Sequence, residues 1–389
     1  MKIGLLKDIK KGEYRTVITP LEAATIVNDG HELLVETGAG AGAGFPDTEY
    51  IKSGAEILKT GDEIWANAEL ITKVKEIEES EFDKMREGQI IVTCLHPAAH
   101  PSEVEALLKN KVIAFTAEDA HRYGSPNCES AGKQGVICGL ESMSVMNGGK
   151  GKFIGGLAGA PSMSVLVLGA GVVGKAAISV LVALGARVTV LANNMQKLRD
   201  LKHHYNEKID VMVSTQENIK RLLPTTDMLL NCVRWPKGAK PYLVTKEMLK
   251  LMEPGSVLVD ISNDEDGAIE SFHETTHEDP RYIVNGVVHY CVSNIPSAMA
   301  MSTSQAYAAV MLKHFRNIAN NGVRNACIND GYLRRSLVSY DGYLTHEETS
   351  ALQGIPWIRP EDILGISNLD LDFAPENTVT RSENFVKIK

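Results

Sequence analysis

Short apolar runs alternate with helical patterns in the first third of the chain. The predicted strands are residues 2–6, 32–37, 70–75, 90–95 and 112–116. Apolar positions with helical spacing lie between them, over 19–30 and 102–109. In the first of these helices, Thr19 suits the N-cap, Pro20 the first helical position and Gly30 the residue just past the end. Strands that alternate with helices predict a parallel sheet covered by helices.

A second series of the same kind begins after a polar, loop-like passage near residues 119–130. We expect a helix over 134–148 and a glycine-rich loop over 148–161. The strands expected after this loop are 164–168, 187–192, 210–214, 228–233 and 256–262. Further on, 306–322 predicts a long helix that packs back on the first series, with no further strands around it. Residues 368–389 are polar and aperiodic, which predicts a tail or arm.

Size and charge narrow the class of protein. A chain of 389 residues with 44% hydrophobic residues can bury two cores rather than one. The formal net charge of −9 argues against a nucleic-acid or anionic-membrane partner, since both need a basic surface. The six cysteines are scattered without a CxxC pair, which is typical of a reducing compartment and predicts no metal site. Without a membrane-length apolar stretch or a signal-peptide core, we expect a cytoplasmic protein.

A glycine motif follows the strand 164–168 directly. Residues 169–174 read G-A-G-V-V-G, between that strand and a helical pattern. Gly169 would make the tight turn, Gly171 would let the backbone approach a pyrophosphate, and Gly174 would let the helix pack closely on the strand. The helix N-terminus would then hold the phosphate charge. This context predicts a dinucleotide site rather than a glycine-rich turn without a ligand.

The end of the next strand bears on the choice of cofactor. An acidic residue usually stands there and accepts hydrogen bonds from the ribose hydroxyls, but this chain has Ala192, followed by Asn193 and Asn194. Lys197 and Arg199 come soon after. Loss of the carboxylate removes its repulsion of a 2′-phosphate, and amide and cationic donors can bind that phosphate. The pattern favours NADP(H) modestly over NAD(H) bound without the usual anchor.

Four residues could carry chemistry. Arg15 follows the first strand and could grip a carboxylate in a bidentate fork, although a solvated basic loop explains it equally well. Lys73 and Lys75 close the strand 70–75 on one face, at the end where α/β proteins bind ligands; edge-strand lysines are the alternative. His96 ends another strand and suits acid–base work, or else lies in a core or loop. Asp264 follows the strand 256–262 among other acids, and the pattern does not choose between them.

Taken in this order, the motifs resemble the alanine dehydrogenase family, over roughly residues 1–365. The resemblance rests on K-x-x-x-x-x-E-x-R (7–15), VETGAGAGAGF (35–45), K-V-K-E (73–76), L-H (95–96), G-G-K-G (148–151), the glycine motif, P-G-S-V-L-V-D-I (254–261) and N-x-P (294–296). The chain is more distantly similar to the NAD-binding subunit of proton-translocating transhydrogenases and to carboxyethyl-ornithine synthase. The family implies two doubly wound, Rossmann-like α/β domains with parallel sheets and a closing cleft between them.

The resemblance also assigns domains and roles. It implies a substrate domain of residues 1–122 and 301–389, a cofactor domain of 123–300, and a homo-oligomer, either hexamer or dimer. By the same likeness, Arg15 and Lys75 hold the substrate carboxylate, while His96 and Asp264 handle protons. The residues expected to bind the cofactor are Gly169, Gly171, Val172, Val173, Gly174, Ala192, Asn193, Asn194 and Asn294.

Several departures from the family pattern affect the substrate more than the reaction. His96 is followed by Pro97, and the passage before 128–132 is shorter than usual. The segment 234–240 reads R-W-P-K-G-A-K, which is larger and more cationic than the family's V-P-G-A-K, and Ala300 replaces a proline. Residues after 367 exceed the family pattern. These changes weaken alanine itself as the substrate but leave the reaction class intact.

The sequence therefore predicts a nicotinamide-dependent dehydrogenase that interconverts a small L-amino acid with its 2-oxo acid and ammonia. One alternative is an opine-type condensation, in which a second amino acid replaces ammonia; the altered segment 234–240 is its only support. The other is a nucleotide-binding protein without turnover, against which the presence of Arg15, Lys75, His96 and Asp264 argues.

Overall fold

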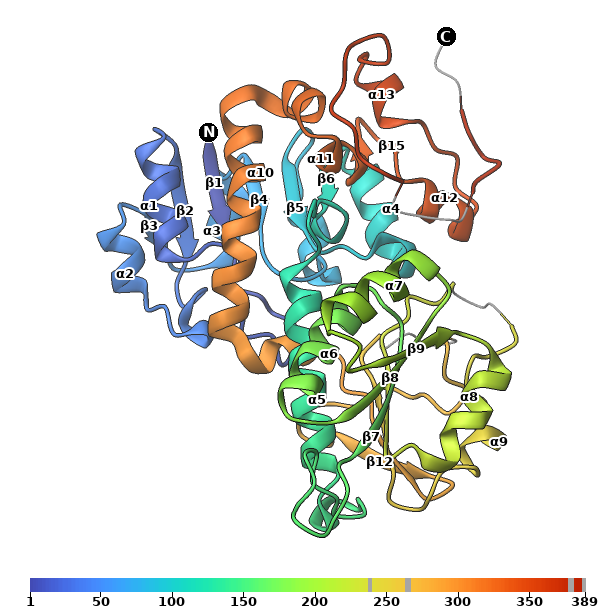
Figure 1. The fold of residues 1–389 in the computed structure, drawn as a ribbon. Coiled ribbons are helices and arrows are strands. Elements are labelled where there is room, and N and C mark those ends of the chain that lie inside the picture. Colours follow the sequence, from blue (N-terminus) through green and yellow to red (C-terminus); the bar gives the residue numbers. More distant parts are fainter. Residues whose placement is uncertain (237–239, 263–266, 377–380, 387–389) are drawn as a thin grey trace. The chain divides into compact units, whose positions relative to one another are not determined.

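The chain forms two compact units. The computed structural model describes residues 1–236, 240–262, 267–376 and 381–386. The first unit contains residues 1–125 together with 300–389, and the second contains 126–299. Both appear in Figure 1, the first unit in blue, cyan, orange and red and the second mainly in green and yellow. Because the chain leaves the first unit and returns to it, the first unit is discontinuous in sequence.

The first unit is built on an eight-stranded sheet with the order β15-β14-β6-β5-β4-β1-β2-β3. Its strands are β1 (Lys2–Leu5), β2 (Glu32–Glu36), β3 (Glu56–Leu58), β4 (Leu70–Thr72), β5 (Ile90–Thr93), β6 (Ile113–Thr116), β14 (Leu337–Tyr340) and β15 (Tyr343–Leu344). Neighbours among β1 to β6 pair in parallel, whereas β14 and β15 are antiparallel additions at one edge. The order 3-2-1-4-5-6 is that of a doubly wound sheet, so the predicted fold class is confirmed for this unit.

Alternate residues of these strands pack on opposite faces of the sheet. Leu5 and Val92 join one core, which includes α10, while Ile71 and Ile91 join the other, which includes α3 and α4. Strands buried on both faces are almost continuously apolar, which is why these runs were recognisable in the sequence. The helices of this unit are α1 (Pro20–Asn28), α2 (Asp47–Lys52), α3 (Gly61–Asn67), α4 (Pro101–Lys109), α10 (Ala300–Asn329), α11 (Gly331–Arg335), α12 (Glu347–Gln353) and α13 (Pro360–Ile363).

The region after residue 300 contains more secondary structure than the sequence predicted. Helix α10 is longer than the expected 306–322, and only Gly322 departs from helical angles within it. It packs on the first unit's sheet and crosses that sheet in Figure 1. The expectation that no strands surround it was wrong, because β14 and β15 form a short hairpin beside β6. Short edge strands of two to four residues carry too little periodicity to be detected in a sequence.

The second unit repeats the same architecture. Its strands are β7 (Ser164–Leu168), β8 (Arg187–Ala192), β9 (Asp210–Val213), β10 (Met228–Asn231), β11 (Val257–Asp260), β12 (Arg281–Val284) and β13 (Val287–Tyr290). They lie in the order β12-β13-β11-β10-β7-β8-β9, and all neighbours pair in parallel except β12 with β13. The helices are α5 (Pro126–Ser142), α6 (Val172–Ala183), α7 (Met195–His204), α8 (Gln216–Leu222) and α9 (Lys246–Leu249). Both sheets are therefore mixed but mostly parallel.

Two local predictions in this unit need correction. The expected loop over 119–130 and helix over 134–148 are replaced by α5, which begins at Pro126 and ends at Ser142. Its glycines lower helix propensity, which obscured the start, but they let it pack closely: a Cβ at Gly132 would lie 2.3 Å from the Val173 carbonyl oxygen. The hairpin β12–β13 was missed, although Asn285 and Gly286 are a favoured turn pair with positive φ.

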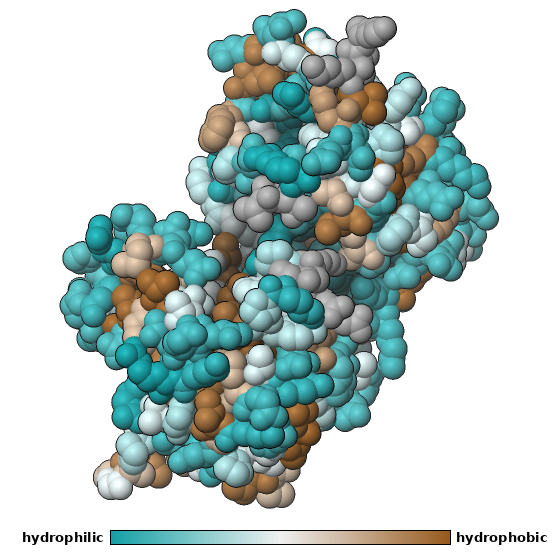
Figure 2. All heavy atoms as spheres, turned by 90° about the vertical axis from the view of Figure 1, so that its right-hand side faces the viewer, coloured by the Kyte–Doolittle hydropathy of each residue, from teal (hydrophilic) through white to brown (hydrophobic). Residues whose placement is uncertain are grey.

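The surface is mainly polar on the face drawn in Figure 2, with separate small groups of hydrophobic side chains. None of the helices in the described ranges is long and apolar enough to cross a membrane.

A buried histidine in the second unit links stability to pH. His289 in β13 is 0% exposed; its Nε2 lies 2.8 Å from Ser271 Oγ and its Nδ1 lies 2.9 Å from the Val287 carbonyl oxygen. Since a carbonyl only accepts, Nδ1 carries the proton and Nε2 accepts from the hydroxyl. Burial, with a smaller contribution from the nearby His273, lowers the pKa of His289 to about 4, although the hydrogen bond to the Val287 carbonyl acts to raise it.

We predict that His289→Gln reduces the acid sensitivity of folding. A folded-state pKa below the unfolded value gives stability that is present above pH 6.5 and is lost as the pH falls toward 4. Between pH 7 and pH 5, the wild type should lose about 2 kcal/mol more of its unfolding free energy than the variant. Urea unfolding at both pH values measures this difference. The exposed His203→Gln serves as control and should behave as wild type; an unchanged pH dependence in His289→Gln would contradict the assignment.

Candidate active site

Strand order locates the candidate sites in both sheets. In each sheet the order reverses between two neighbouring parallel strands, β1 and β4 in the first unit and β7 and β10 in the second. Loops that follow such strands run to opposite faces of the sheet and leave a crevice at the carboxyl ends. The residues that follow β1 and β4 include Arg15 and Lys75, and those that follow β7 are the glycine motif.

The glycine motif forms a tight loop between β7 and α6. Gly169 has a φ of 105°, and a Cβ there would lie 2.6 Å from the Cys232 carbonyl oxygen. A Cβ at Gly174 would lie 2.1 Å from the Gly169 carbonyl oxygen. At Gly171 nothing lies within 4 Å of the Cβ position. Two glycines are thus needed for packing, whereas the third leaves open space where a ligand's phosphates could approach the backbone.

The start of α6 completes this loop. Gly171 is the N-cap residue, and Val172 and Val173 form the first helical positions. Backbone N–H groups of a first helical turn lack partners within the helix and attract anions. The residues present therefore fit a dinucleotide pyrophosphate.

The other expected cofactor residues are in the second unit too. Ala192 ends β8, and Asn194 is the N-cap of α7, where its side-chain oxygen accepts the Lys197 backbone N–H at 2.9 Å. Asn193 lies between them and is exposed. Asn294 has a φ of 64° and precedes the short 3-10 helix η7 (Ile295–Met299). The end of β8 thus presents amide groups and no carboxylate.

In the first unit, Glu76 lies at the centre of a cluster of charged side chains. Its carboxylate is 2.8 Å from His96 Nδ1, 2.9 Å from Lys10 Nζ and 3.6 Å from Lys75 Nζ. Burial alone would raise the pKa of Glu76, but the hydrogen bond to His96 and the charges of Lys75 and Lys10 outweigh it and hold the pKa well below its usual range. Glu76 therefore remains ionised and accepts a hydrogen bond from His96 Nδ1–H, which leaves Nε2 as the nitrogen that can exchange a proton with a ligand.

His96 lies in a constrained turn after β5. Its φ of 45° and ψ of 50° are left-handed, and its backbone N–H donates to Glu118 Oε1 at 2.7 Å. A non-glycine residue holds this conformation only where its surroundings fix it. The side chain is 42% exposed, so the ring is accessible while its Nδ1 edge is held by Glu76.

Arg15 is buried and firmly oriented. Its Nε and Nη2 donate to the two carboxylate oxygens of Glu13 at 2.8 and 2.6 Å. The charges of Arg15, Lys75 and Glu118 all act on the pKa of the buried Cys94 thiol: Glu118 raises it, and Lys75 and Arg15 lower it. Burial raises the pKa of Cys94 to about 12, so it is a neutral group here. Arg15, Lys75 and the residues around His96 therefore share one neighbourhood within the first unit.

The prediction for Lys73 and Lys75 was wrong in one respect. β4 ends at Thr72, so the two lysines are not alternate residues of a strand and do not share a face. Lys73 is fully buried and paired with Glu81 at 2.7 Å, which makes it structural, whereas Lys75 reaches Glu76. Chain geometry after the strand end, which local periodicity does not determine, separates them.

Several residues near the site were not singled out in the sequence. Asp8 accepts the backbone N–H groups of Lys10 and Lys75 and so joins the loops after β1 and β4. Tyr307, from α10, has its hydroxyl 3.1 Å from Cys94 Sγ. Glu76 could have been noticed as the acid that ends K-V-K-E, but nothing local marks Asp8 or Tyr307, which are brought in by tertiary contacts.

Asp264 lies outside the described residues, as do Glu265 and Asp266. The nearby Asp260 is buried at the end of β11, where its carboxylate accepts Asn231 Nδ2 at 2.9 Å. In the described ranges, no group of three or more His, Cys, Asp or Glu residues could hold a metal ion.

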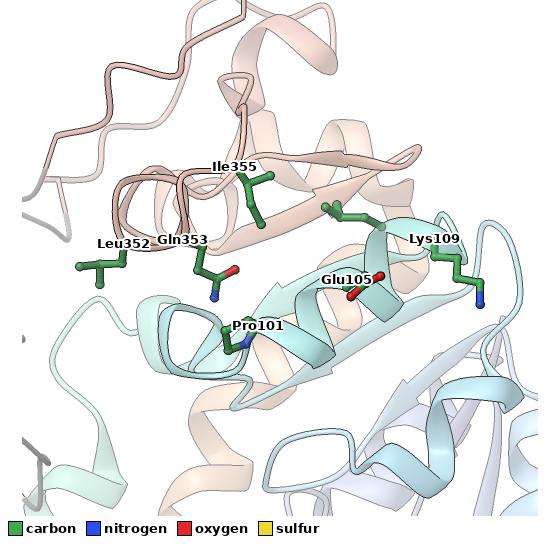
Figure 3. A pocket seen from close by; sticks show the side chains of 7 residues that line it. Pro101, Glu105, Lys109, Leu352, Gln353 and Ile355 are labelled. Atoms are coloured by element: carbon green, nitrogen blue, oxygen red, sulfur yellow. The ribbon is translucent and has the colours of Figure 1, made fainter.

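A separate surface groove of about 680 Å³ opens between α4 and the end of α12 (Figure 3). Glu105 and Lys109 line it from α4, and Leu352 and Ile355 line it from the other side. None of the candidate residues is among its lining side chains, so the groove is not part of the candidate active site.

Comparisons with known proteins identify the family of this chain. Residues 4–126 match the N-terminal domain model of alanine dehydrogenase/PNT, and residues 135–347 match the C-terminal domain model. An alanine dehydrogenase from Methanococcus maripaludis is 37% identical over 371 residues, which cover 94% of this chain and the whole of that relative. One from Geobacillus stearothermophilus is 37% identical over 372 residues with the same coverage.

Solved structures give the same result for the fold. An L-alanine dehydrogenase superposes with a TM-score of 0.85 at 32% identity, and the match covers 91% of this chain and 99% of that one. A transhydrogenase from Sinorhizobium meliloti shares the fold, with a TM-score of 0.74 at 22% identity over 89% of this chain and 99% of that one. The chain therefore belongs to the alanine dehydrogenase/PNT family, and it is a nicotinamide-dependent amino-acid dehydrogenase.

Proposed function

We propose that the chain catalyses the reversible oxidative deamination of a small L-amino acid to its 2-oxo acid and ammonia. L-Alanine and pyruvate are the first pair to test, because the similar proteins are alanine dehydrogenases. The observation that carries the proposal is the cluster in which ionised Glu76 orients His96 beside Lys75. We assign substrate binding to residues 1–122 and 301–389 and dinucleotide binding to 123–300, in a cytoplasmic homo-oligomer, either hexamer or dimer.

Arg15 and Lys75 would bind the substrate carboxylate. Arg15 is held in one orientation by Glu13, and a fixed guanidinium loses little freedom when it binds an anion. Lys75 lies 3.6 Å from Glu76, farther than a normal hydrogen bond, so its ammonium can turn toward an incoming carboxylate without breaking a short contact. The fixed Arg15 and the adjustable Lys75 would together hold the 2-oxo acid in place for attack at its carbonyl carbon.

His96 would move protons at the reacting carbon. Glu76 accepts the hydrogen bond from Nδ1, so Nε2 would take a proton from ammonia as it adds and pass it to the carbonyl oxygen, which becomes a hydroxyl group. A second proton, which ammonium gave up to form ammonia, then lets the hydroxyl group leave as water. Glu76 is thus a positioning residue, since it acts through the imidazole ring. Asp264 is proposed as a second proton-transfer group on the family resemblance, and it lies outside the described residues.

The nicotinamide cofactor, when bound, accepts hydride from the amino acid or donates it to the imine. Gly171 and the first turn of α6 would hold its pyrophosphate, together with Gly169, Gly174, Val172 and Val173 of the same loop. We propose Asn294 as a further contact. At the adenosine end, Ala192, Asn193 and Asn194 offer amide donors without a carboxylate, which supports NADP(H) over NAD(H).

The proposed reaction is tested by following oxidation of NADPH or NADH with ammonia and a panel of small 2-oxo acids. Oxidation that requires ammonia is the expected result. A signal with an amino-acid donor but none with ammonia would instead indicate opine-type condensation. Cofactor binding without oxidation of either kind would indicate a nucleotide-binding protein without turnover.

We predict that His96→Ala lowers kcat by about 10²–10⁴-fold, the usual contribution of acid–base catalysis, with cofactor affinity unchanged. Glu76→Gln should lower kcat about tenfold, because the amide still accepts from Nδ1 but no longer stabilises a positive ring. Steady-state kinetics and cofactor fluorescence titration measure the two effects. Glu79→Gln, the same change at an exposed position, is the matched control. Wild-type turnover in His96→Ala would rule out its role.

The glycine loop gives a second prediction. Gly171→Ala should weaken cofactor binding by at least tenfold without loss of stability, because its Cβ meets no protein atom but would fill the space for the phosphates. Gly174→Ala should lower the melting temperature, because its Cβ would meet the Gly169 carbonyl oxygen at 2.1 Å. Thermal unfolding and cofactor titration of both variants separate these effects. Unaltered cofactor affinity in Gly171→Ala would place the dinucleotide elsewhere.

A third prediction concerns the choice of cofactor. Ala192→Asp places a carboxylate at the end of β8, where it repels a 2′-phosphate and accepts from ribose hydroxyls. The ratio of kcat/KM for NADPH to that for NADH should fall at least tenfold. Ala192→Asn, which is similar in size but neutral, is the control. An unchanged ratio in Ala192→Asp would show that the 2′ position is bound at another residue.

A further inference from the structure

The C-terminal arm, residues 367–376 and 381–386, is the last part of the first unit and is drawn in red in Figure 1. Relatives that align over their whole length cover 94% of this chain, so part of the chain has no counterpart in them. The arm is not a free tail, because two groups of contacts join it to the turn that carries His96.

Asp372 fixes the first half of the arm. Its carboxylate accepts the backbone N–H of Gly331 at 2.9 Å and pairs with Arg122. Its carbonyl oxygen accepts Arg334 Nη2 at 2.8 Å. The arm runs so close to the start of α11 that a Cβ at Gly331 would lie 2.5 Å from that carbonyl oxygen. Most residues of this half are exposed or only partly buried, so Asp372 is the point at which it is fixed to the rest of the unit.

These contacts lead to His96 through the short segment between β6 and α5. Arg122 belongs to that segment, and Arg335 joins it to the arm: Nη1 donates to an arm carbonyl at 2.7 Å and Nε donates to the Asp119 carbonyl at 2.8 Å. Glu118, in the same segment, accepts the backbone N–H of His96 at 2.7 Å. Movement of the arm would thus be transmitted to the carboxylate that holds the His96 backbone.

The second half of the arm acts through α12. Arg381 donates to Glu347, at the start of α12, at 3.0 Å. At the other end of α12, Gln353 Nε2 donates to the carbonyl oxygen of Pro97, the residue after His96, at 2.7 Å. Figure 3 shows Gln353 on the side of the groove opposite α4, near Pro101. Both halves of the arm are therefore connected, through other residues, to the turn that contains His96 and Pro97.

We propose that the arm is a clasp that holds the left-handed turn of His96 and so positions its imidazole for proton transfer. The inference rests on the proposed role of His96. A φ of 45° is unfavourable for a histidine, so the turn needs contacts that hold it. One hydrogen bond runs from the His96 backbone N–H to Glu118, and another runs from Gln353 to the carbonyl oxygen of the next residue, Pro97. Asp372 and Arg381 are positioning residues in this scheme, since neither contacts His96 itself.

The clasp is tested in the full-length chain with Asp372→Ala and Arg381→Ala. Asp370→Ala is the matched control, since Asp370 is an exposed acid on the same arm. Backbone hydrogen exchange of the fragment containing His96 reports the turn, and kcat, KM and cofactor affinity report the reaction. We expect faster exchange at His96 and about tenfold lower kcat in Asp372→Ala. A smaller effect of the same kind is expected in Arg381→Ala, with cofactor affinity and the control unchanged.

Arg381 is largely exposed, so its variant should fold even if Asp372→Ala is too unstable to study. Unchanged exchange at His96 in both variants would overturn the clasp, and so would faster exchange with wild-type kcat. Failure of the proposed function is a different result, because the wild type would then show no ammonia-dependent oxidation. In that case the exchange at His96 alone would decide whether the arm holds the turn.

Discussion

At two places in the molecule, neighbouring parallel strands are followed by chain that leaves toward opposite faces of the sheet. Between β1 and β4, and again between β7 and β10, the strand order reverses, and such a reversal places a crevice at the carboxyl ends of the strands. The side chains around Glu76 follow the strands at the first reversal, and the glycine loop follows β7 at the second. Strand order thus determines where the candidate site of each unit lies, and the residues of the loops determine which functional groups it contains.

Within the first unit, the balance of buried charges decides what the site can do. A carboxylate as buried as Glu76 would ordinarily hold its proton, but three positively charged or donating neighbours keep it ionised. An ionised Glu76 determines which nitrogen of His96 carries a proton. Burial of charge is costly in stability, and here it serves to fix one tautomer and one ring orientation.

The parts of the candidate site that the sequence predicted are those marked by a pattern of neighbouring residues. The glycine loop needs three glycines at fixed spacing because two would clash with carbonyl oxygens and the third must leave space. His96 was noticeable because it ends an apolar strand. Lys73 and Lys75 were placed wrongly because the strand ends at Thr72, three residues before the predicted end at 75. The strands β3, β12, β13, β14 and β15, which lie at or next to the sheet edges, were not predicted because each has only two to four residues.

The sequence by itself determined the two doubly wound sheets, the dinucleotide loop and the set of residues to consider, because strand periodicity and glycine spacing are properties of neighbouring residues. Only the tertiary structure showed that Glu76 contacts His96 and Lys75, whereas Lys73 pairs with Glu81. It also showed that Asp8 joins two loops and that the C-terminal arm reaches His96 through Glu118 and Gln353. The three hydrogen bonds join residues 67, 22 and 256 positions apart, so no local pattern records them.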